Sequence, residues 1–445
     1  MDRDGLTVMP EASPALAAPD VVPGFWPHLL NRARPHHPSA DPRGGAAFRA
    51  LRSPPYRLYF LGQIASASGS FLQATALGWL VFQLTGSATA LGLVLAAGSL
   101  PTLLLGPWGG VLADRIELRT LLIGTQLTSG VLAAALWVAA EVGAARVPLL
   151  VAVSVAGGLV SVADSPARQA FAATLVPPQD LASAISLNGV IMNSARVVGP
   201  AIAALLIATV GTTPCFAVNA VSYLAVIAAL IAIRDRATTP TRPATRGGVR
   251  DGLRYARTKP QLWLPLAMMS LVGLLAFNFG VVLPVLAQHD LRGGGGTYGL
   301  MSTLLSCGAV LGSLCAGLVH HPRRIYLASA AVAFGLGMAA TAVAPTVPIA
   351  CVTLAATGIA AFMLVTLTST TLQLHAEPAY RGRIMALFSF LYLGTTPIGS
   401  PLIGWITSTF GARAALLVGA AACLIVGITA WRVRTPPAPE IIQSG

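Results

Sequence analysis

The chain has 445 residues, of which 55% are hydrophobic and only 10% are charged. Soluble domains carry about 25% charged residues, so this composition excludes a water-soluble globular protein and indicates an integral membrane protein. The net charge of +13 would suit a nucleic-acid-binding protein if the basic residues formed one patch, but they recur between hydrophobic segments, so no nucleic acid is expected.

The first fifty residues are rich in Pro, Ala and Arg and lack the continuous apolar core of a secretory signal. We therefore expect residues 1–50 to form a disordered cytoplasmic N-terminal tail. Arg outnumbers Lys 27 to 1 in the chain, a bias typical of GC-rich bacterial genomes.

Twelve hydrophobic segments follow, each near the roughly 20 residues that a membrane-spanning helix needs. We place them at 57–83, 88–112, 119–140, 147–171, 181–208, 212–233, 261–287, 297–319, 325–344, 348–374, 382–409 and 412–431. The predicted fold class is an all-α integral membrane protein with twelve transmembrane helices.

A basic stretch divides these segments into two sets of six. It is interpreted as a basic cytoplasmic linker, residues 235–259, between an N-terminal six-helix bundle, residues 51–234, and a C-terminal six-helix bundle, residues 260–434. A cytoplasmic tail, residues 435–445, ends the chain. The halves repeat weakly, because a shift of 201 residues lays Asp180–Leu187 on Arg381–Phe388. Two pseudo-symmetric bundles with a substrate site between them are a known transporter plan.

The distribution of basic residues predicts the topology. If the N-terminus is inside, 24 of the 28 Lys and Arg residues fall on the inner side. Arg146, Arg292 and Arg413 fall outside, and Arg196 falls within a span. Positive charge is retained on the cytoplasmic side, so both termini are predicted to be cytoplasmic, in a multi-pass protein of the bacterial inner membrane.

The loop after the second span, residues 109–119, reads GGVLADRIELR. Gly110 would let two helices approach closely, and Asp114 at the membrane border can accept hydrogen bonds from a helix N-terminus. Arg115 and Arg119 lie one turn apart and can pair with carboxylates. The alternative is an ordinary positive-inside loop with an incidental acid.

This loop resembles the signature loop of the major facilitator superfamily, and the matching residues are Gly110, Leu112, Ala113, Asp114, Arg115 and Arg119. Other stretches resemble its exporter branch, which includes the enterobactin exporter and macrolide-efflux proteins: residues 164–171 (DSPARQAF), 193–200 (NSARVVGP), 215–219 (CFAVN) and 381–386 (RGRIMA). The resemblance implies a twelve-helix secondary transporter of efflux type, powered by an ion gradient.

Asp164 and Arg168 are spaced i, i+4 and can pair on one helix face. The resemblance implies that they form a gating cluster with Asp114, Arg115 and Arg119, which holds the two halves together in the outward-open state. A local ion pair near the headgroups is the alternative. Asp164 is the deepest carboxylate in the chain, which makes it a candidate proton carrier.

Two polar stripes are candidates for the transport path. Arg196 lies about sixteen residues into the fifth span, with Asn193 three residues earlier, and a charge near mid-membrane normally faces a cavity or a partner. The alternative is a structural arginine packed against helix carbonyls. The first span carries a second stripe, Gln63, Ser66, Ser70 and Gln73, for which cavity lining is preferred over interhelical packing. Asn278 is a weaker cavity candidate.

Gly199 and Pro200 in the fifth span and Pro401 in the eleventh are predicted helix-kink positions, because proline removes a backbone donor. Simple tolerance of proline in membrane helices is the alternative. No phosphate-binding loop or metal-ligand spacing is present, so the sequence predicts no enzyme, no metal and no cofactor.

The preferred hypothesis is a secondary-active efflux transporter of an amphipathic small molecule, such as a drug, a macrolide or a siderophore, which works by alternating access. Its expected partners are this substrate, the lipid bilayer and a coupling proton, and a monomer is expected. One alternative is a lipid or lysolipid transporter of the same fold. Another is a non-transporting membrane receptor or scaffold.

Overall fold

The computed structural model describes residues 46–233, 249–319, 322–378 and 380–432. The predicted C-terminal tail, most of the predicted N-terminal tail and most of the predicted linker lie outside these residues. The described residues from 47 onward belong to one compact unit, and the fold described here is that of this unit.

Secondary structure within the described ranges is helical, without strands. The elements of the first half are η1 (Ala46–Arg52), α1 (Pro54–Thr85), α2 (Ala88–Arg115), α3 (Leu118–Glu141), α4 (Val147–Thr174), η2 (Pro178–Asp180), α5 (Leu181–Thr209) and α6 (Thr213–Ala232). Those of the second half are α7 (Val249–Thr258), α8 (Pro260–Leu275), α9 (Phe279–Val285), η3 (Leu286–Asp290), α10 (Gly295–Gly317), α11 (Arg324–Ala342), α12 (Val347–His375), α13 (Arg381–Leu393), α14 (Thr396–Phe410) and α15 (Ala412–Arg432).

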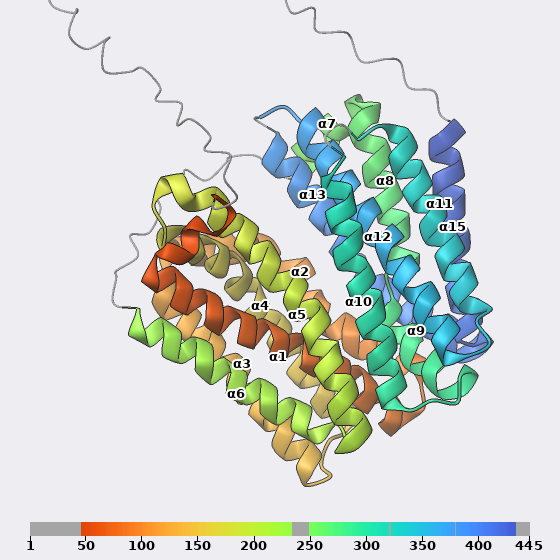
Figure 1. Cartoon of the computed structure of the whole chain (residues 1–445), viewed down its shortest axis with the longest axis horizontal. Coiled ribbons are helices and arrows are strands. Elements are labelled where there is room, and N and C mark those ends of the chain that lie inside the picture. Colours follow the sequence, from red (N-terminus) through yellow and green to blue (C-terminus); the bar gives the residue numbers. More distant parts are fainter. Residues whose placement is uncertain (1–45, 234–248, 320–321, 379, 433–445) are drawn as a thin grey trace, which may run out of the picture. The chain divides into compact units, whose positions relative to one another are not determined.

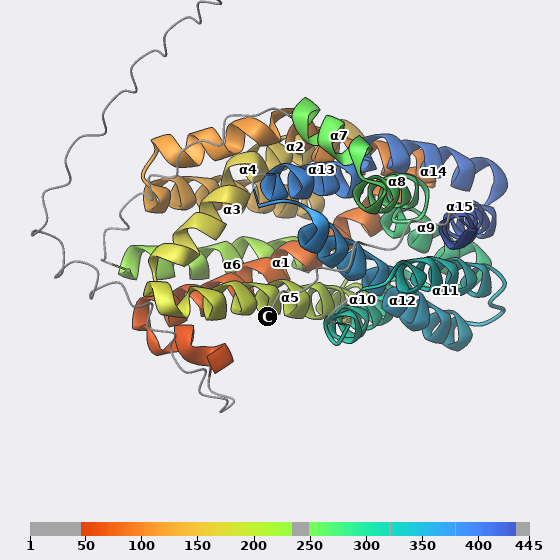
Figure 2. The same cartoon turned by 90° about the horizontal axis from the view of Figure 1, so that it is seen from above.

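Twelve helical segments in the described ranges are long and apolar enough to cross a membrane, which confirms the predicted fold class. Helices α1–α6 pack into one bundle and α8–α15 into a second, as the colours from red to green and from green to blue show in Figure 1 and Figure 2. The chain is therefore a multi-pass membrane protein.

The seventh and eleventh spans are each made of two helices rather than one. In the seventh, α8 ends before Asn278, whose Nδ2 donates to the carbonyl of Leu274 at 2.8 Å and so satisfies a freed backbone acceptor. In the eleventh, α13 and α14 are separated at Gly394 and Thr395, just before Pro397, which cannot continue the hydrogen-bond ladder of α13.

The two helix breaks lie against each other. A methyl group added to Gly273, near the end of α8, would meet Thr395 Oγ1 at 2.9 Å, and one added to Gly399 would meet the backbone of Leu274. Ser400 of α14 also donates to Asn278 Oδ1 at 3.0 Å. Glycine at these positions therefore lets the interrupted backbones of both spans approach closely.

The last part of the predicted linker is a helix, α7, which packs on α8 and α13. Tyr255 of α7 stacks on Tyr380 with ring centroids 4.2 Å apart and planes 7° from parallel. Lys259 Nζ lies 3.0 Å from Tyr255 Oη and 2.6 Å from Glu377 Oε1. These contacts join the start of the second half to the segment that precedes α13.

The ion pair between Lys259 and Glu377 gives this junction a dependence on pH. The hydrogen bond from Lys259 lowers the pKa of Glu377, and the hydrogen bond to Glu377 raises the pKa of Lys259. The stabilisation is therefore lost as pH falls through the folded-state pKa of Glu377, and again as pH rises through that of Lys259. Both groups are exposed, so the effect is local and weakened by salt.

We predict that Glu377→Gln increases amide hydrogen exchange in α7, because α7 loses the ionic part of its attachment to the segment before α13. The difference in protection from the wild type should be largest near neutral pH and should vanish in acid, where Glu377 is protonated in both proteins. Glu141→Gln, an exposed carboxylate at the end of α3, is the matched control. Equal protection of α7 in the wild type and Glu377→Gln at neutral pH would contradict the prediction.

Candidate functional site

A cavity of about 270 Å³ lies where α5 of the first bundle faces the second bundle. Its walls come from α5, α9, α10, α12 and the two helix breaks. The lining residues are Arg196, Phe277, Phe279, Leu305, Ser306, Ala309, Phe362, Tyr392 and Thr396. Of these residues only Arg196 is charged, and four of the nine are aromatic, so the cavity combines one cation and polar hydroxyl groups with aromatic and aliphatic surface.

Arg196 is held between aromatic rings of both bundles. Its guanidinium carbon lies 4.4 Å from the ring centroid of Phe362 in α12 and 6.0 Å from that of Phe71 in α1. Its Nε is buried and has no hydrogen-bond partner among the described residues. The ring faces offset part of the cost of a cation at this depth, but they leave the guanidinium donors available to the cavity.

The aromatic side of the cavity is built at the helix breaks. Phe277 lies in the break between α8 and α9, and it meets Tyr392 of α13 edge to face at 5.1 Å and Phe362 at 6.1 Å. Such edge-to-face contacts fix ring orientation. The predicted candidate Asn278 is buried beside these rings and bonds Ser400 and Leu274, so it shapes the break and is not one of the lining residues.

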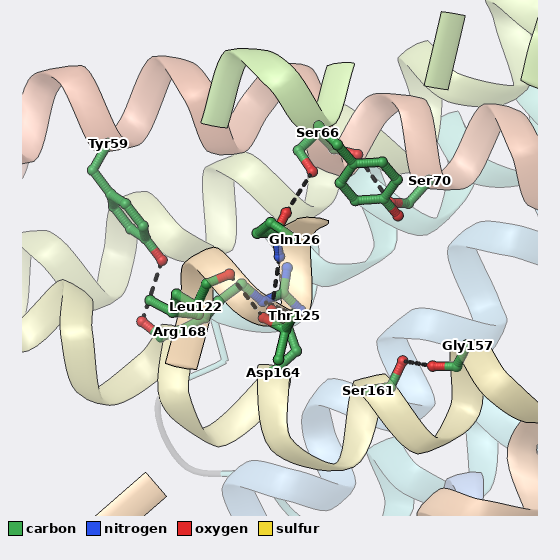
Figure 3. A network of polar contacts seen from close by, with 11 residues as sticks. Tyr59, Ser66, Ser70, Leu122, Thr125, Gln126, Gly157, Ser161, Asp164 and Arg168 are labelled. Atoms are coloured by element: carbon green, nitrogen blue, oxygen red, sulfur yellow. Dashed lines mark hydrogen bonds and ion pairs between the residues drawn. The ribbon is translucent and has the colours of Figure 1, made fainter. Parts of the chain in front are cut away.

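A second polar site lies inside the first bundle, around Asp164 of α4 (Figure 3). The carboxylate accepts hydrogen bonds from Thr125 Oγ1 at 2.8 Å and Gln126 Nε2 at 2.7 Å, and it pairs with Arg168 Nε at 2.9 Å. Asp164 is buried, with 8% of its surface exposed. The predicted pair with Arg168 is present, and two neutral donors from α3 complete the coordination of the carboxylate.

The polar stripe of α1 bonds to neighbouring helices. Ser66 donates to Gln126 Oε1 at 3.3 Å, Ser70 contacts Tyr223 Oη at 3.2 Å, and Gln73 Oε1 accepts from Asn219 at 2.7 Å. These bonds to α3 and α6 support interhelical packing, the less favoured of the two interpretations. Gln63 is buried, and its Nε2 lacks a hydrogen-bond partner within the part of the chain that the structure describes.

The remaining members of the predicted gating cluster do not join Asp164 in this structure. Asp114 and Arg115 are exposed at the end of α2. Arg119 donates to the carbonyls of Leu230 and Ile231, at the end of α6. Those carbonyls have no partner within their own helix, so Arg119 caps α6 instead of pairing with a carboxylate.

The glycine that brings α2 close to α4 is Gly109, and not Gly110 as the sequence suggested. A methyl group on Gly109 would collide with the carbonyl of Val162, whereas one on Gly110 would meet open space. The helix has 3.6 residues per turn, so adjacent glycines point about 100° apart and only one can face a given neighbour.

The predicted kink positions lie within continuous helices. Gly199 and Pro200 lie inside α5, and Pro401 lies inside α14, so the interruption of the eleventh span is at Gly394 and Thr395. Gly199 faces α1, where an added methyl group would meet Phe71 Cβ at 2.5 Å. Asn193, half-buried one turn before Arg196, is not one of the cavity-lining residues.

The two bundles contact each other mainly along α2–α14 and α5–α10. The contacts lie at what we call the distal end, the helix ends around Thr85–Ala88 and Phe410–Ala412, opposite to the described chain ends Ala46 and Arg432.

Close packing between the two bundles keeps the distal end closed. Trp79 stacks on Tyr298 at 6.1 Å, and the amide and hydroxyl of Thr89 both donate to Ser408 Oγ, at 3.1 and 3.0 Å. A methyl group on Gly92 would collide with the carbonyl of Ser400.

Several site residues were not predicted, namely Phe71, Phe277, Phe279, Phe362 and Tyr392 around the cavity, and Thr125 and Gln126 around Asp164. In the sequence, nothing distinguishes these aromatic residues from the other apolar residues of their spans. Gln126 does carry a signal, because an uncharged polar residue within a span needs a partner in another helix.

We predict that Gln126→Leu destabilises the first bundle, because Asp164 and Ser66 both lose a hydrogen bond. Bonds of this kind between membrane helices contribute about 1 kcal/mol, so the free energy of unfolding of the purified protein in detergent should fall by a similar amount. Gln169→Leu, at an exposed position of α4, is the control and should unfold like the wild type. An unchanged free energy of unfolding in Gln126→Leu would show that these bonds do not stabilise the bundle.

Comparison with known proteins places the chain in a family. Residues 45–444 match the family model described as transmembrane secretion effector. The chain is 27% identical over 391 residues to the multidrug efflux pump Tap of Mycolicibacterium fortuitum, covering 84% of this chain and 95% of the pump. It is 23% identical over 355 residues to macrolide efflux protein A of Streptococcus pyogenes, covering 76% and 85%.

Among solved structures, a bacterial homologue of the human lysosomal transporter Spinster, in an inward-facing and occupied conformation, superposes with a TM-score of 0.70 at 14% identity. The match covers 87% of this chain and all of that one, 100%, and shows the shared fold. The family model extends over almost all of the residues, so this chain belongs to the transmembrane secretion effector family of major facilitator superfamily transporters.

Proposed function

We propose that the protein is a secondary-active exporter of an amphipathic small molecule, such as a drug, a macrolide or a siderophore, and that it works by alternating access as a monomer. The observation that carries the proposal is the cavity between the bundles, which is lined by one cation and by four aromatic side chains. Such a surface suits a molecule with both polar and apolar parts. The two similar efflux proteins support outward transport.

Closure of the distal end supports alternating access. A transporter of this plan exposes one central site to each side in turn, so the bundles must contact each other at one end while the other end is separated. Both termini are proposed to be cytoplasmic, by the distribution of basic residues. In that orientation the present conformation, closed at the distal end, is the one that receives substrate from the cytoplasm.

The cluster at the opposite end is proposed to act in the other conformation. Asp114 and Arg115 are exposed here, which leaves them available to the second bundle when that end closes. Asp114 could then accept hydrogen bonds at the N-terminus of a helix of the second bundle. Asp164 and Arg168, already paired, would support this contact from within the first bundle.

A coupling proton is proposed to bind at Asp164. The carboxylate is buried in a membrane-spanning helix, and its partners can reorganise around either charge state, because Thr125 and Gln126 carry both donor and acceptor groups. Intramembrane carboxylates commonly take part in proton relays. Release of Arg168 would accompany protonation.

The exporter proposal is tested in proteoliposomes that contain the full-length protein, a fluorescent amphipathic drug and a pH-sensitive dye. We expect drug transport against a pH gradient, and proton movement that depends on the drug. Flux of neither would contradict the proposal and favour a receptor or scaffold. In that case, loss of function on deletion of residues 1–45 would show that the function depends on the N-terminal tail. Lysolipid competition separates a lipid transporter from a drug transporter.

We predict that Asp164→Asn abolishes drug-dependent proton flux, because the amide cannot carry a proton, while drug binding persists. Asp251→Asn, an exposed carboxylate on α7, is the matched control and should couple like the wild type. Unchanged coupling in Asp164→Asn would remove this residue from the proton pathway.

We predict that Gly92→Leu shifts the protein away from the present conformation, because the side chain would force α2 from Ser400 of α14. Distances between spin labels placed across the distal end should lengthen, and transport should fall by about tenfold or more, since a closed distal end is needed in each cycle. Gly106→Leu on the same helix, where an added methyl group meets nothing within 4 Å, is the control. Unchanged distances in Gly92→Leu would contradict this role of the α2–α14 contact.

A further inference from the structure

The charge of Arg196 is not balanced by a carboxylate in the cavity. No acidic residue occurs among the lining residues. Three carboxylates in the described part of the chain are paired elsewhere: Asp164 with Arg168, Asp290 with Arg413, and Glu377 with Lys259. The other described acidic residues lie at helix ends or in loops, namely Asp114, Glu117, Glu141, Asp180 and Asp251.

The aromatic rings satisfy Arg196 only in part. A ring face attracts a guanidinium, but it offers no oxygen or nitrogen atom to accept a hydrogen bond from the N–H groups. The Nε of Arg196 therefore stays unpaired. A guanidinium presents five donors in a planar fork, and a carboxylate fills this fork with two parallel hydrogen bonds. In a low-dielectric cavity this pairing is stronger than in water. The complement that the site lacks is therefore an oxyanion.

The other lining residues of the cavity determine which part of a ligand can lie next to the oxyanion. Phe277 and Phe362 line the same surface with their ring planes at 88° to each other, beside the aliphatic side chains of Leu305 and Ala309. The volume of about 270 Å³ is slightly below the roughly 300–1,000 Å³ of pockets for drug-sized ligands. It suits an acidic group and the adjoining apolar part of a larger molecule.

We propose that the exported molecule carries a carboxylate that binds Arg196, with an adjoining aromatic or aliphatic part against Phe277 and Phe362. This inference rests on the proposed export function and names the chemical class of its substrate. A neutral alcohol binds more weakly because its single oxygen can fill only one arm of the fork and carries no charge, and a cationic analogue is repelled. The site thus selects acidic amphipaths over basic ones, which narrows the proposed substrates to those that carry a carboxylate and disfavours a basic macrolide.

The test uses three probes with the same apolar body and different charge: pyrenebutyrate, pyrenebutanol and (pyrenylbutyl)trimethylammonium. Each is titrated against the full-length protein in nanodiscs at neutral pH, with empty nanodiscs subtracted. We expect the carboxylate to bind about tenfold more tightly than the alcohol, as one charge-assisted hydrogen bond would give, and the ammonium to bind most weakly. When the pH drops below the pKa of the pyrenebutyrate carboxyl group, the affinity for this probe should fall and the affinities for the other two should not.

Variants test whether Arg196 causes the preference for the carboxylate probe. Arg196→Gln should bring the carboxylate and the alcohol to equal affinity, and Arg196→Lys should keep the order with a smaller ratio, because an ammonium cannot form the planar fork. Arg146→Gln, which removes an exposed arginine at the start of α4, is the matched control and should bind like the wild type. If Arg196→Gln does not fold, the three-probe series on the wild type and on Arg196→Lys still tests whether Arg196 binds the carboxylate.

Two outcomes would overturn the inference: a wild type that does not prefer the carboxylate, and a preference that survives in Arg196→Gln. The second would make Arg196 a structural residue that packs between the bundles. Transport of the same probes into inverted vesicles separates this failure from failure of the export function. Transport of pyrenebutanol without an acid preference would leave export standing, whereas transport of none of the probes would refute export itself.

Discussion

A polar group inside a hydrocarbon layer must find its hydrogen-bond partner within the protein, and this constraint organises both bundles. Asp164 is satisfied by α3 and by Arg168, Ser66 and Gln73 of α1 by α3 and α6, and the interrupted backbone of the seventh span by Asn278. Each polar residue thus fixes the contact between two helices. Gln63 and Arg196 depart from this rule: the Nε2 of Gln63 and the Nε of Arg196, which lies between two rings, have no hydrogen-bond partner among the described residues.

The spans could be predicted because a membrane helix has one dominant requirement, a length of apolar sequence, and all twelve agree with the structure to within a few residues. The breaks at Asn278 and Gly394 could not, since each lies inside a segment that is long and apolar enough to be one span. An isolated asparagine or a proline within a span is as compatible with a continuous helix as with a broken one. Pro200 and Pro401 illustrate this, because both lie in unbroken helices.

The candidate sites were predictable to different degrees for a similar reason. Arg196 and Asp164 stand out because an intramembrane charge is costly wherever it is placed. Their surroundings depend on tertiary packing: Phe362 is 166 positions from Arg196 in the sequence, and nothing local distinguishes it from neighbouring apolar residues. The choice between Gly109 and Gly110 likewise depends on helix rotation, which the motif alone does not specify.

The short helix α13 connects two features that lie far apart. Its beginning follows Tyr380, which stacks on Tyr255 of α7, and near its end Tyr392 lines the cavity. Thirteen residues of α-helix span about 20 Å and behave as a stiff rod. The break at Gly394 and Thr395 uncouples this rod from α14, which packs on α2. We therefore expect a displacement of α7 to move α13 and with it the ring of Tyr392, while the α2–α14 contact beyond the break stays in place.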